Sequence, residues 1–316
     1  MKILANDGIA SGGKKQLEDA GIEVVTTKVA QEQLANYINE NKVTGIIVRS
    51  ATKVREDLIN SCPNLKIIGR AGVGMDNIDV AYARSKGVHV FNTPAASSAS
   101  VAELVFAHLY SGVRFLHDSN RNMPLEGDSR FKELKKSYAG GRELRGKTLG
   151  IIGFGRIGRE VAKIALGIGM KVIASDRTEG EAEVTLEFYN HQEVKIPIKT
   201  EPVEQLIEHS DFITLHVPAQ KEPVIGRDQF QKMKDGVGII NAARGGVVDE
   251  VALVEALESG KVSFAGLDTF EHEPSPAIKV LMNPNVSLSP HIGAATKEAQ
   301  ERIGYELAEE IIRVLK

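Results

Sequence analysis

The feature that most constrains this chain is the glycine pattern Gly153, Gly155 and Gly158, set between two apolar segments. Residues 149–152 predict a buried strand, and the helical spacing of apolar residues over 161–168 predicts a helix. In such a unit the first glycine allows a tight turn, the second admits a pyrophosphate and the third lets helix pack on strand. The helix amides then face the diphosphate. A glycine-rich turn without function is the alternative, but the complete unit favours dinucleotide binding.

The second strand of this unit indicates which dinucleotide is bound. Residues 171–174 are mostly apolar and lead to Asp176. The spacing from the last glycine of the pattern to this carboxylate is close to the usual value of about 20 residues, at which the carboxylate accepts the ribose hydroxyls. A carboxylate there repels the extra phosphate of NADP, although the neighbouring Arg177 is a weak hint toward NADP. We therefore expect NAD.

Size and composition indicate an ordinary globular protein. The chain has 316 residues, 42% hydrophobic and 26% charged, with a net charge of −3. That length suits two domains, and the charge gives no reason to expect nucleic acid or an anionic membrane as partner. The single Cys62 fits a reducing compartment, and neither a signal peptide nor a membrane-spanning run is recognisable. We expect a cytoplasmic protein.

Residues 1–94 alternate short apolar strands with helical segments, which predicts a second doubly wound parallel sheet. This sheet has no glycine fingerprint, so it needs another role. The predicted fold is therefore α/β with two doubly wound domains. Residues 1–94 and 293–316 form a smaller flavodoxin-like substrate domain, and residues 95–292 form a Rossmann-type cofactor domain with a hairpin inserted near 183–198.

Two loops of the first domain look suited to an anion. Arg49 and Lys53 follow one predicted strand, and Arg70, Gly72 and Gly74 follow the next. Ligands of such sheets bind beyond the carboxyl ends of the strands, where these guanidinium groups and bare amides would meet an acid with more than one negative charge. A solvated basic edge is the alternative.

A polar segment, residues 120–146, has no clear periodicity and reads as an ordered surface excursion. Its lysines at 132, 135 and 136 either reach an anionic substrate or remain solvated. Sequence alone leaves open whether Lys132, Lys135 or Lys136 contacts substrate.

Three further segments follow strands of the second domain, and their side chains suffice for hydride transfer between NAD and an alcohol. Arg244 can hold a carboxylate through two N–H groups, His291 titrates in the useful range, and Glu273 would fix its tautomer. Glu271 and His272 compete for the last two roles, and Arg244 has a purely structural alternative. None of the eight histidines shows metal-ligand spacing, so no metal site is expected.

Taken together, these stretches closely resemble the D-2-hydroxyacid dehydrogenase family, and within it the D-3-phosphoglycerate dehydrogenases. The resemblance is carried by residues 70–79, 92–94, 153–158, 241–250, 273–274 and 289–300. It implies Arg244, Glu273 and His291 as catalytic residues. The expected cofactor contacts are Gly153, Gly155, Arg156, Ile157, Gly158, Asp176, Val217, Pro218, Ala242, Ala243, Asp268, His291, Gly293 and Ala294. The expected substrate contacts are Arg49, Ser50, Lys53, Arg70, Gly72, Val73, Gly74, Arg244 and His291.

The same resemblance implies NAD-dependent oxidation of 3-phospho-D-glycerate to 3-phosphohydroxypyruvate, the entry to serine, by a homodimer joined through the cofactor domain. The alternatives are the same chemistry on glycerate, hydroxypyruvate, glyoxylate or D-lactate, or a dinucleotide-sensing corepressor-type protein. The sequence departs from the family pattern at Val73, where threonine is common, and in its longer hairpin. Because the chain stops after its last predicted helix, the serine-sensing domain of longer members is not expected.

Overall fold

The computed structural model describes residues 1–178 and 180–315, which divide into two compact units. One unit comprises Met1–Ser100 together with the C-terminal residues from Ala294 on, and the other comprises Val101–Gly293. The sequence placed the first boundary at residue 94. In the structure it lies later, inside helix α5 (Ser98–Val113), which continues from one unit into the next.

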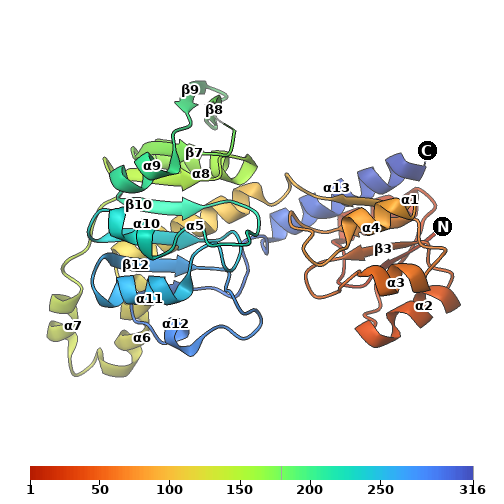
Figure 1. Ribbon diagram of the computed structural model, residues 1–316, viewed down its shortest axis with the longest axis horizontal. Coiled ribbons are helices and arrows are strands. Elements are labelled where there is room, and N and C mark those ends of the chain that lie inside the picture. The colour runs from red at the N-terminus through yellow and green to blue at the C-terminus, as the bar shows by residue number, and fades with distance from the viewer. Residues whose placement is uncertain (179, 316) are drawn as a thin grey trace. The chain divides into compact units, whose positions relative to one another are not determined.

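The first unit is built on a five-stranded parallel sheet with strand order β2-β1-β3-β4-β5 (Figure 1). This is the flavodoxin-like order, in which the chain changes direction between the first and third strands. Its elements are β1 (Lys2–Ala5), α1 (Ser11–Asp19), β2 (Glu23–Val25), a 3-10 turn (Gln31–Gln33), α2 (Leu34–Glu40), β3 (Gly45–Val48), α3 (Glu56–Ser61), β4 (Ile67–Arg70), α4 (Val80–Ser85), β5 (His89–Asn92) and the C-terminal α13 (Lys297–Leu315).

Helices cover both faces of this sheet, as the unbroken apolar runs of its strands require. All four residues of β3 are buried. Helix α13 returns to pack on α1. The two helices approach so closely that a Cβ at Gly13 would lie 2.3 Å from the carbonyl oxygen of Gly304, so only glycine fits at this position. The last helix thereby completes the core of the first unit.

The second unit contains a six-stranded parallel sheet with strand order β13-β12-β11-β10-β6-β7 and a separate two-stranded hairpin (Figure 1). After α5 its elements are α6 (Leu116–Glu126), α7 (Phe131–Ser137), β6 (Thr148–Ile152), α8 (Arg156–Gly167), β7 (Lys171–Ser175), β8 (Glu181–Glu187), β9 (Glu193–Lys199), α9 (Val203–His209), β10 (Phe212–Leu215), α10 (Arg227–Lys232), β11 (Val237–Asn241), α11 (Glu250–Glu258), β12 (Val262–Leu267), α12 (Ile278–Leu281) and β13 (Val286–Leu288).

The predicted hairpin is β8–β9, an antiparallel pair that lies beside β7 and α8. It occupies the place in the chain where a dinucleotide-binding half normally has its third parallel strand. At that place in the chain the described residues form an isolated parallel bridge, between Thr200 and Ala174 of β7. The side chains of Val184 and Ile198 are buried and pack in the core of the unit, which anchors the hairpin.

The polar segment after α5 differs from the sequence prediction. Residues interpreted as an ordered surface excursion without clear periodicity form two helices, α6 and α7, with Pro124 inside the first. The reason is physical: α6 has no buried residue and α7 buries only Leu134, so neither helix carries the apolar stripe by which helices are recognised.

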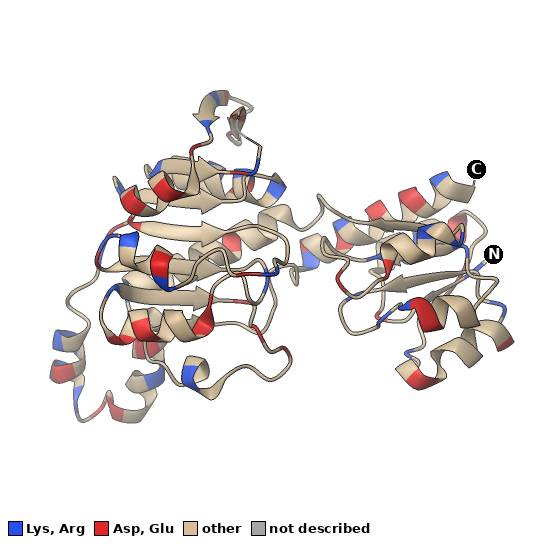
Figure 2. Ribbon diagram, viewed as in Figure 1, with Lys and Arg blue, Asp and Glu red and all other residues tan. Residues whose placement is uncertain are grey.

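No described helix is both long and apolar enough to cross a bilayer. Acidic and basic side chains are mixed over the helices of each unit (Figure 2), in keeping with the small net charge. Within the described residues, no group of three or more histidine, cysteine, aspartate or glutamate side chains gathers to hold a metal ion.

Candidate active site

Three neighbouring strands of the second unit end side by side. Asn241 at the end of β11 pairs with Leu267 at the end of β12, which pairs in turn with Leu288 at the end of β13. The three loops that the sequence singled out therefore leave the sheet at one edge, where ligands of doubly wound folds bind.

Glu273 and His291 form a hydrogen-bonded pair across two of these loops. Oε2 of Glu273 lies 2.8 Å from Nδ1 of His291, and Oε1 accepts a 3.0 Å bond from the Phe270 amide. A proton held on Nδ1 by the carboxylate leaves the Nε2 lone pair of a neutral imidazole available. The side chains are 37% and 44% exposed, so a ligand can reach the pair.

The competing assignment, Glu271, has a different task. Its Oε1 accepts from the amide of Glu250, and its own amide donates to Oε1 of Glu250, which ties the loop to the start of α11. Glu250 is nearly buried, and burial raises the pKa of its carboxyl group. The geometry thus favours Glu273 over Glu271 as the partner of an imidazole.

The turn that carries Arg244 is joined to the same pair through Phe270. Asn241 shapes this turn, since its Nδ2 donates to the Arg244 carbonyl and its Oδ1 accepts from the Ala243 amide. A Cβ at Gly245 would lie 1.8 Å from the carbonyl oxygen of Phe270, so the turn rests on that residue. Phe270 in turn donates its amide to Glu273, as above. Nη1 of Arg244 donates to the Ala243 carbonyl at 2.7 Å.

The glycine turn has the shape that a diphosphate requires. Gly153 has a φ of +93°, and a Cβ there would lie 2.5 Å from the carbonyl oxygen of His216. A Cβ at Gly158 would lie 2.2 Å from the carbonyl oxygen of Gly153, so helix and turn touch. Gly155 precedes α8 and, apart from its chain neighbours, has no described atom within 4 Å of its Cβ position. That open side beside the α8 amides of Arg156 and Ile157 fits a pyrophosphate.

Asp176 stands at the end of β7 and supports this turn directly. Its Oδ2 accepts a 2.7 Å bond from the Phe154 amide, inside the glycine motif. The neighbouring Arg177 donates from Nη2 to Oε1 of Gln220 at 2.6 Å. The carboxylate is therefore held at the strand end where the ribose of a dinucleotide lies in such folds.

Two other predicted cofactor segments also follow strands of this sheet. Val217 and Pro218 come after β10, which is the neighbour of β6 across the topological switch point, and Ala242 and Ala243 come after β11. His216, which opens the first of these segments, donates its amide to the Ile152 carbonyl at 2.7 Å. These positions line the edge that carries the glycine turn.

Asp268 has a structural task that the sequence reasoning missed. It is 1% exposed, and its carboxylate accepts from the Ile292 amide at 2.8 Å and from the Gly293 amide at 2.8 Å. These amides follow His291, whose φ of +54° lies in the left-handed region that a residue with a side chain seldom adopts. The carboxylate therefore fixes the loop that carries the imidazole.

The first unit holds the predicted anion loops at its own switch point, between β1 and β3. Arg49, Ser50 and Lys53 follow β3, and Arg70 ends the adjacent β4 ahead of Gly72–Gly74. A cavity of about 270 Å³ opens there, lined by Asp7, Gly8, Ile9, Ala10, Arg49, Ala71, Gln300, Ile303 and Leu307. In doubly wound folds this crevice is where ligands bind.

Asp7 is a further residue that the sequence reasoning did not single out. Its carboxylate accepts from the amides of Arg49 at 2.7 Å and Thr52 at 3.1 Å, and from the Thr52 hydroxyl at 2.8 Å. The arginine loop is thus pre-shaped by an acidic side chain. Its position directly after β1 was the signal that could have revealed it. In the next loop, Nη1 of Arg70 donates to the Ala71 carbonyl at 2.6 Å.

The remaining predicted positions lie on α7, in the loop after β4 and at the start of the C-terminal segment. Lys132, Lys135 and Lys136 are exposed on α7, and their contact with a substrate stays a prediction. Val73 is exposed in the loop after β4, and Ala294 begins the C-terminal part of the first unit, where its carbonyl accepts from Gln300.

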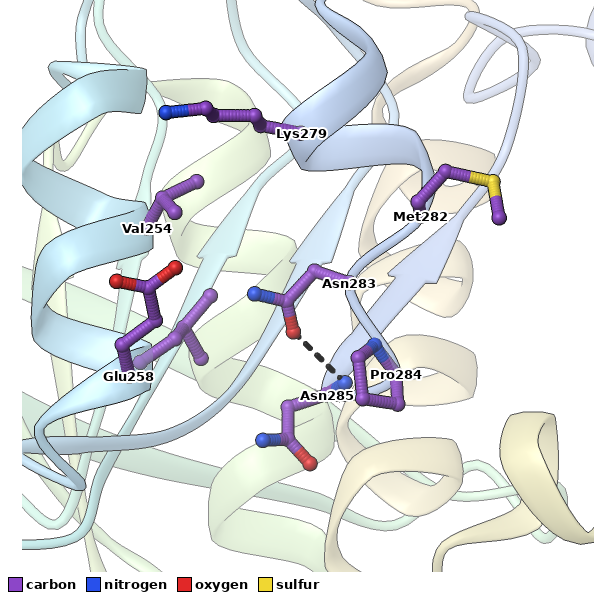
Figure 3. A pocket seen from close by; sticks show the side chains of 8 residues that line it. Val254, Glu258, Lys279, Met282, Asn283, Pro284 and Asn285 are labelled. Atoms are coloured by element: carbon purple, nitrogen blue, oxygen red, sulfur yellow. Dashed lines mark hydrogen bonds between the residues drawn. The ribbon is translucent and has the colours of Figure 1, made fainter.

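A larger cavity of about 430 Å³ lies elsewhere in the second unit, between the end of α11, α12 and the turn before β13 (Figure 3). It is lined by Val254, Leu257, Glu258, Lys279, Met282 and Asn283–Asn285, and the Asn285 amide donates to Oδ1 of Asn283 at 3.0 Å. Because this turn enters β13, the cavity lies at the opposite end of the strand from His291. It holds none of the predicted site residues.

The sequence of this chain is similar to those of known proteins. Residues 106–293 match the family described as D-isomer specific 2-hydroxyacid dehydrogenase, NAD binding domain. The chain belongs to this family. Its cofactor is NAD, and its reaction class is NAD-dependent dehydrogenation of 2-hydroxy acids.

Relatives with different substrates share this similarity. A hydroxypyruvate reductase from Thermotoga maritima is 46% identical over 299 residues, which cover 93% of this chain and 91% of that protein. A D-3-phosphoglycerate dehydrogenase from Archaeoglobus fulgidus is 42% identical over 320 residues, covering all of this chain but 58% of the relative. The chain thus spans little more than half the length of that dehydrogenase.

Solved structures confirm the two-domain α/β fold. The NAD+-bound 3-phosphoglycerate dehydrogenase of Entamoeba histolytica has a TM-score of 0.77 at 30% identity, covering 100% of this chain and 95% of that one. A glyoxylate reductase from Paecilomyes thermophila has a TM-score of 0.83 at 28% identity, with the same coverage.

Proposed function

We propose that this protein oxidises 3-phospho-D-glycerate to 3-phosphohydroxypyruvate with NAD. The observation that carries the dehydrogenase chemistry is the 2.8 Å bond between Glu273 and His291, at the same sheet edge as the glycine turn. Similarity to D-3-phosphoglycerate dehydrogenases over the whole chain supports the choice of acid.

In this proposal the chain's own residues bind the acid and move one proton. Arg244 takes the substrate carboxylate through its guanidinium group. Nε2 of His291 accepts the proton of the C2 hydroxyl as the C2 hydride leaves and the carbon becomes a carbonyl, while Glu273 keeps the imidazole in the tautomer that can accept. NAD, when bound, supplies the acceptor for that hydride.

The substrate phosphate is assigned to the loops of the first unit. Arg49 lines the cavity at the switch point, and Lys53 and Arg70 come from the same two adjacent strand ends. Two or more cations at one edge suit a dianion better than a neutral hydroxymethyl group. This is the feature of the proposal that separates phosphorylated from plain acids.

The test compares purified protein on 3-phospho-D-glycerate and D-glycerate with NAD, and on the two corresponding keto acids with NADH. We expect kcat/KM to favour the phosphorylated acid. The Arg49→Gln variant should lose about 10- to 100-fold in kcat/KM for that acid and little for glycerate, since a charge-assisted contact is removed. Lys28→Gln, an exposed position of the same unit, is the matched control. Equal kcat/KM for both acids would refute the phosphate assignment.

A second candidate is reduction of hydroxypyruvate or glyoxylate. Two observations favour it: the Thermotoga maritima relative matches nearly the full length of both proteins, and the carboxylate of Asp7 already takes two amides of the arginine loop. Preference for hydroxypyruvate over its phosphorylated form in the same assay would select this candidate. Absence of turnover with every acid, together with NAD binding, would instead favour the corepressor-type role.

We further propose a homodimer joined through the second unit. Large apolar side chains are exposed on α5, α6 and α7, namely Tyr110, Leu116, Met123, Leu125 and Phe131. A contiguous exposed apolar patch usually marks an interface, and these five side chains lie on three successive helices. Sedimentation should give twice the chain mass of 34.2 kDa, and a Leu125→Glu, Phe131→Glu variant should sediment as a monomer. A monomeric parent would refute the dimer.

We also propose a cytoplasmic protein that serves serine biosynthesis, which the buried free thiol of Cys62 and the proposed substrate support. A cell that lacks its own phosphoglycerate dehydrogenase should grow without added serine when it expresses this chain. Fractionation should recover the chain with other cytoplasmic proteins.

A further inference from the structure

A buried histidine on α5 reaches the loop of His291 through hydrogen bonds. His108 is 4% exposed, with Nδ1 2.9 Å from Oγ of Ser287 and Nε2 2.9 Å from Oγ of Ser289. The hydroxyl of Ser289 donates to Oδ1 of Asp268 at 2.6 Å. The series therefore runs from the helix, through the residue that directly follows β13, to the carboxylate that holds the catalytic loop.

The protons of this series can be assigned by counting donors. Ser289 has one hydroxyl proton and gives it to Asp268, so toward His108 it must accept a proton from Nε2–H. In a neutral imidazole Nδ1 then accepts from the hydroxyl of Ser287. Burial lowers the pKa of His108 and is the largest influence on it. The charge of Asp268 raises this pKa and His117 lowers it further, and the net lowering keeps the ring neutral. This tautomer satisfies both nitrogens of His108, and the Ser287 proton given to Nδ1 is then not available for the longer 3.5 Å contact with Ser111.

Helix α5 packs closely on β12 at this position. A Cβ at Gly266 of β12 would lie 2.6 Å from Cβ of His108, so only glycine leaves room for it there. His108 lies on the same helix face as the buried Val105 and Leu109, where an apolar residue would fill the space equally well. A polar ring at this position, with both nitrogens bonded, therefore has a use beyond packing.

We propose that His108 is a positioning residue for the proton acceptor. Its Nε2–H orients Ser289, Ser289 orients Asp268, and Asp268 holds the amides of Ile292 and Gly293 directly after His291. This series keeps the left-handed backbone of His291 in the conformation that meets Glu273. The inference rests on the proposed role of His291 and not on which acid is the substrate.

Two amide variants test this with matched chemistry. His108→Gln keeps an N–H donor near the Nε2 position and can still serve Ser289, whereas His108→Asn places its amide near Nδ1 and cannot. We expect the asparagine variant to lose about 10-fold or more in kcat. The glutamine variant should recover most of the kcat. Ser289→Ala should reproduce the loss, and combining it with His108→Asn should add little more.

A second measurement needs neither cofactor nor substrate. Hydrogen exchange of the segment 289–294 in the free protein should be faster in the asparagine and alanine variants and near the parent rate in the glutamine variant. Equal kcat and equal exchange in all variants would overturn the proposal. Equal loss in the glutamine and asparagine variants, with lowered melting temperatures, would also overturn it by showing a packing role. Lack of turnover by the parent protein would defeat the proposed function, while the exchange experiment would still decide this inference.

Discussion

The partly buried imidazole of His216 leads to a quantitative prediction about acid stability. It follows β10 at the glycine turn, its Nε2 lies 3.0 Å from Oγ1 of Thr214, and its Nδ1 is buried without a partner among the described residues. Burial lowers the pKa of this side chain from 6.5 to about 3. Between these two values the unfolded chain binds a proton that the folded chain does not, so stability falls as the pH drops below 6.5.

The size of this effect follows from the shift. One pKa unit corresponds to about 1.4 kcal/mol, so at pH 5.0, about 1.5 units below the unfolded value, protonation of His216 in the unfolded chain costs the second unit about 2 kcal/mol. His216→Gln retains a donor toward Thr214 but does not titrate. Its stability should therefore fall by about 2 kcal/mol less than that of the parent between pH 7.5 and pH 5.0.

The assay must report on one unit, because a chain of two units need not unfold in a single step. The chain has no tryptophan, so hydrogen exchange of the β6 and β10 peptides is the suitable probe. Other titrating groups, His108 among them, are present in both proteins and cancel in the difference. His209→Gln, at an exposed position on α9, is the control and should keep the parent's pH dependence. An unchanged pH dependence in His216→Gln would refute the reasoning.

Three further predictions concern catalysis and cofactor. Replacing His291 by Gln should lower kcat by about 100- to 10,000-fold, and Glu273→Gln should lower kcat less; a parent-like rate in His291→Gln would exclude it as proton acceptor. Asp176→Ala should raise kcat/KM for NADP relative to NAD, and an unchanged ratio would contradict the assigned ribose contact. Gly158→Ala should abolish NAD binding in calorimetry while the protein stays folded, because its Cβ would meet the carbonyl of Gly153 at 2.2 Å.

Much of the fold could be predicted because its strands are buried on both faces. Apolar runs predicted β6 and β7 to within one residue at each end, and alternation of apolar and polar residues predicted the hairpin β8–β9. Helix α6 was missed for the converse reason, since none of its residues is buried and periodicity therefore carries no signal.

Residue type and position after a strand end were enough to predict part of the candidate site. Parallel strands end at a common edge, so placing Arg244, Glu273 and His291 after such strands predicted where they would lie. Residue type could not show that Asp268 holds the His291 loop or that Asp7 shapes the Arg49 loop, because both depend on tertiary hydrogen bonds. Asp79 illustrates the same limit: it stands directly before α4, but its side chain bonds Arg55 and the first amide of α3 instead of capping α4.

The sequence nevertheless contains a sign of the hydrogen-bonded series around His108, because it departs there from the usual apolar pattern of a buried helix face. The apolar stripe of α5 passes through Val105, His108 and Leu109, and a strand of the same sheet carries a glycine, Gly266, where the histidine ring needs room. A polar residue on an apolar stripe is unfavourable unless its hydrogen bonds are met, so its presence indicates buried partners. Serines stood at the end of the chain's last strand, beside the catalytic loop, and they supply those partners. A violated pattern next to a catalytic loop thus indicates the side chains that hold the loop in place.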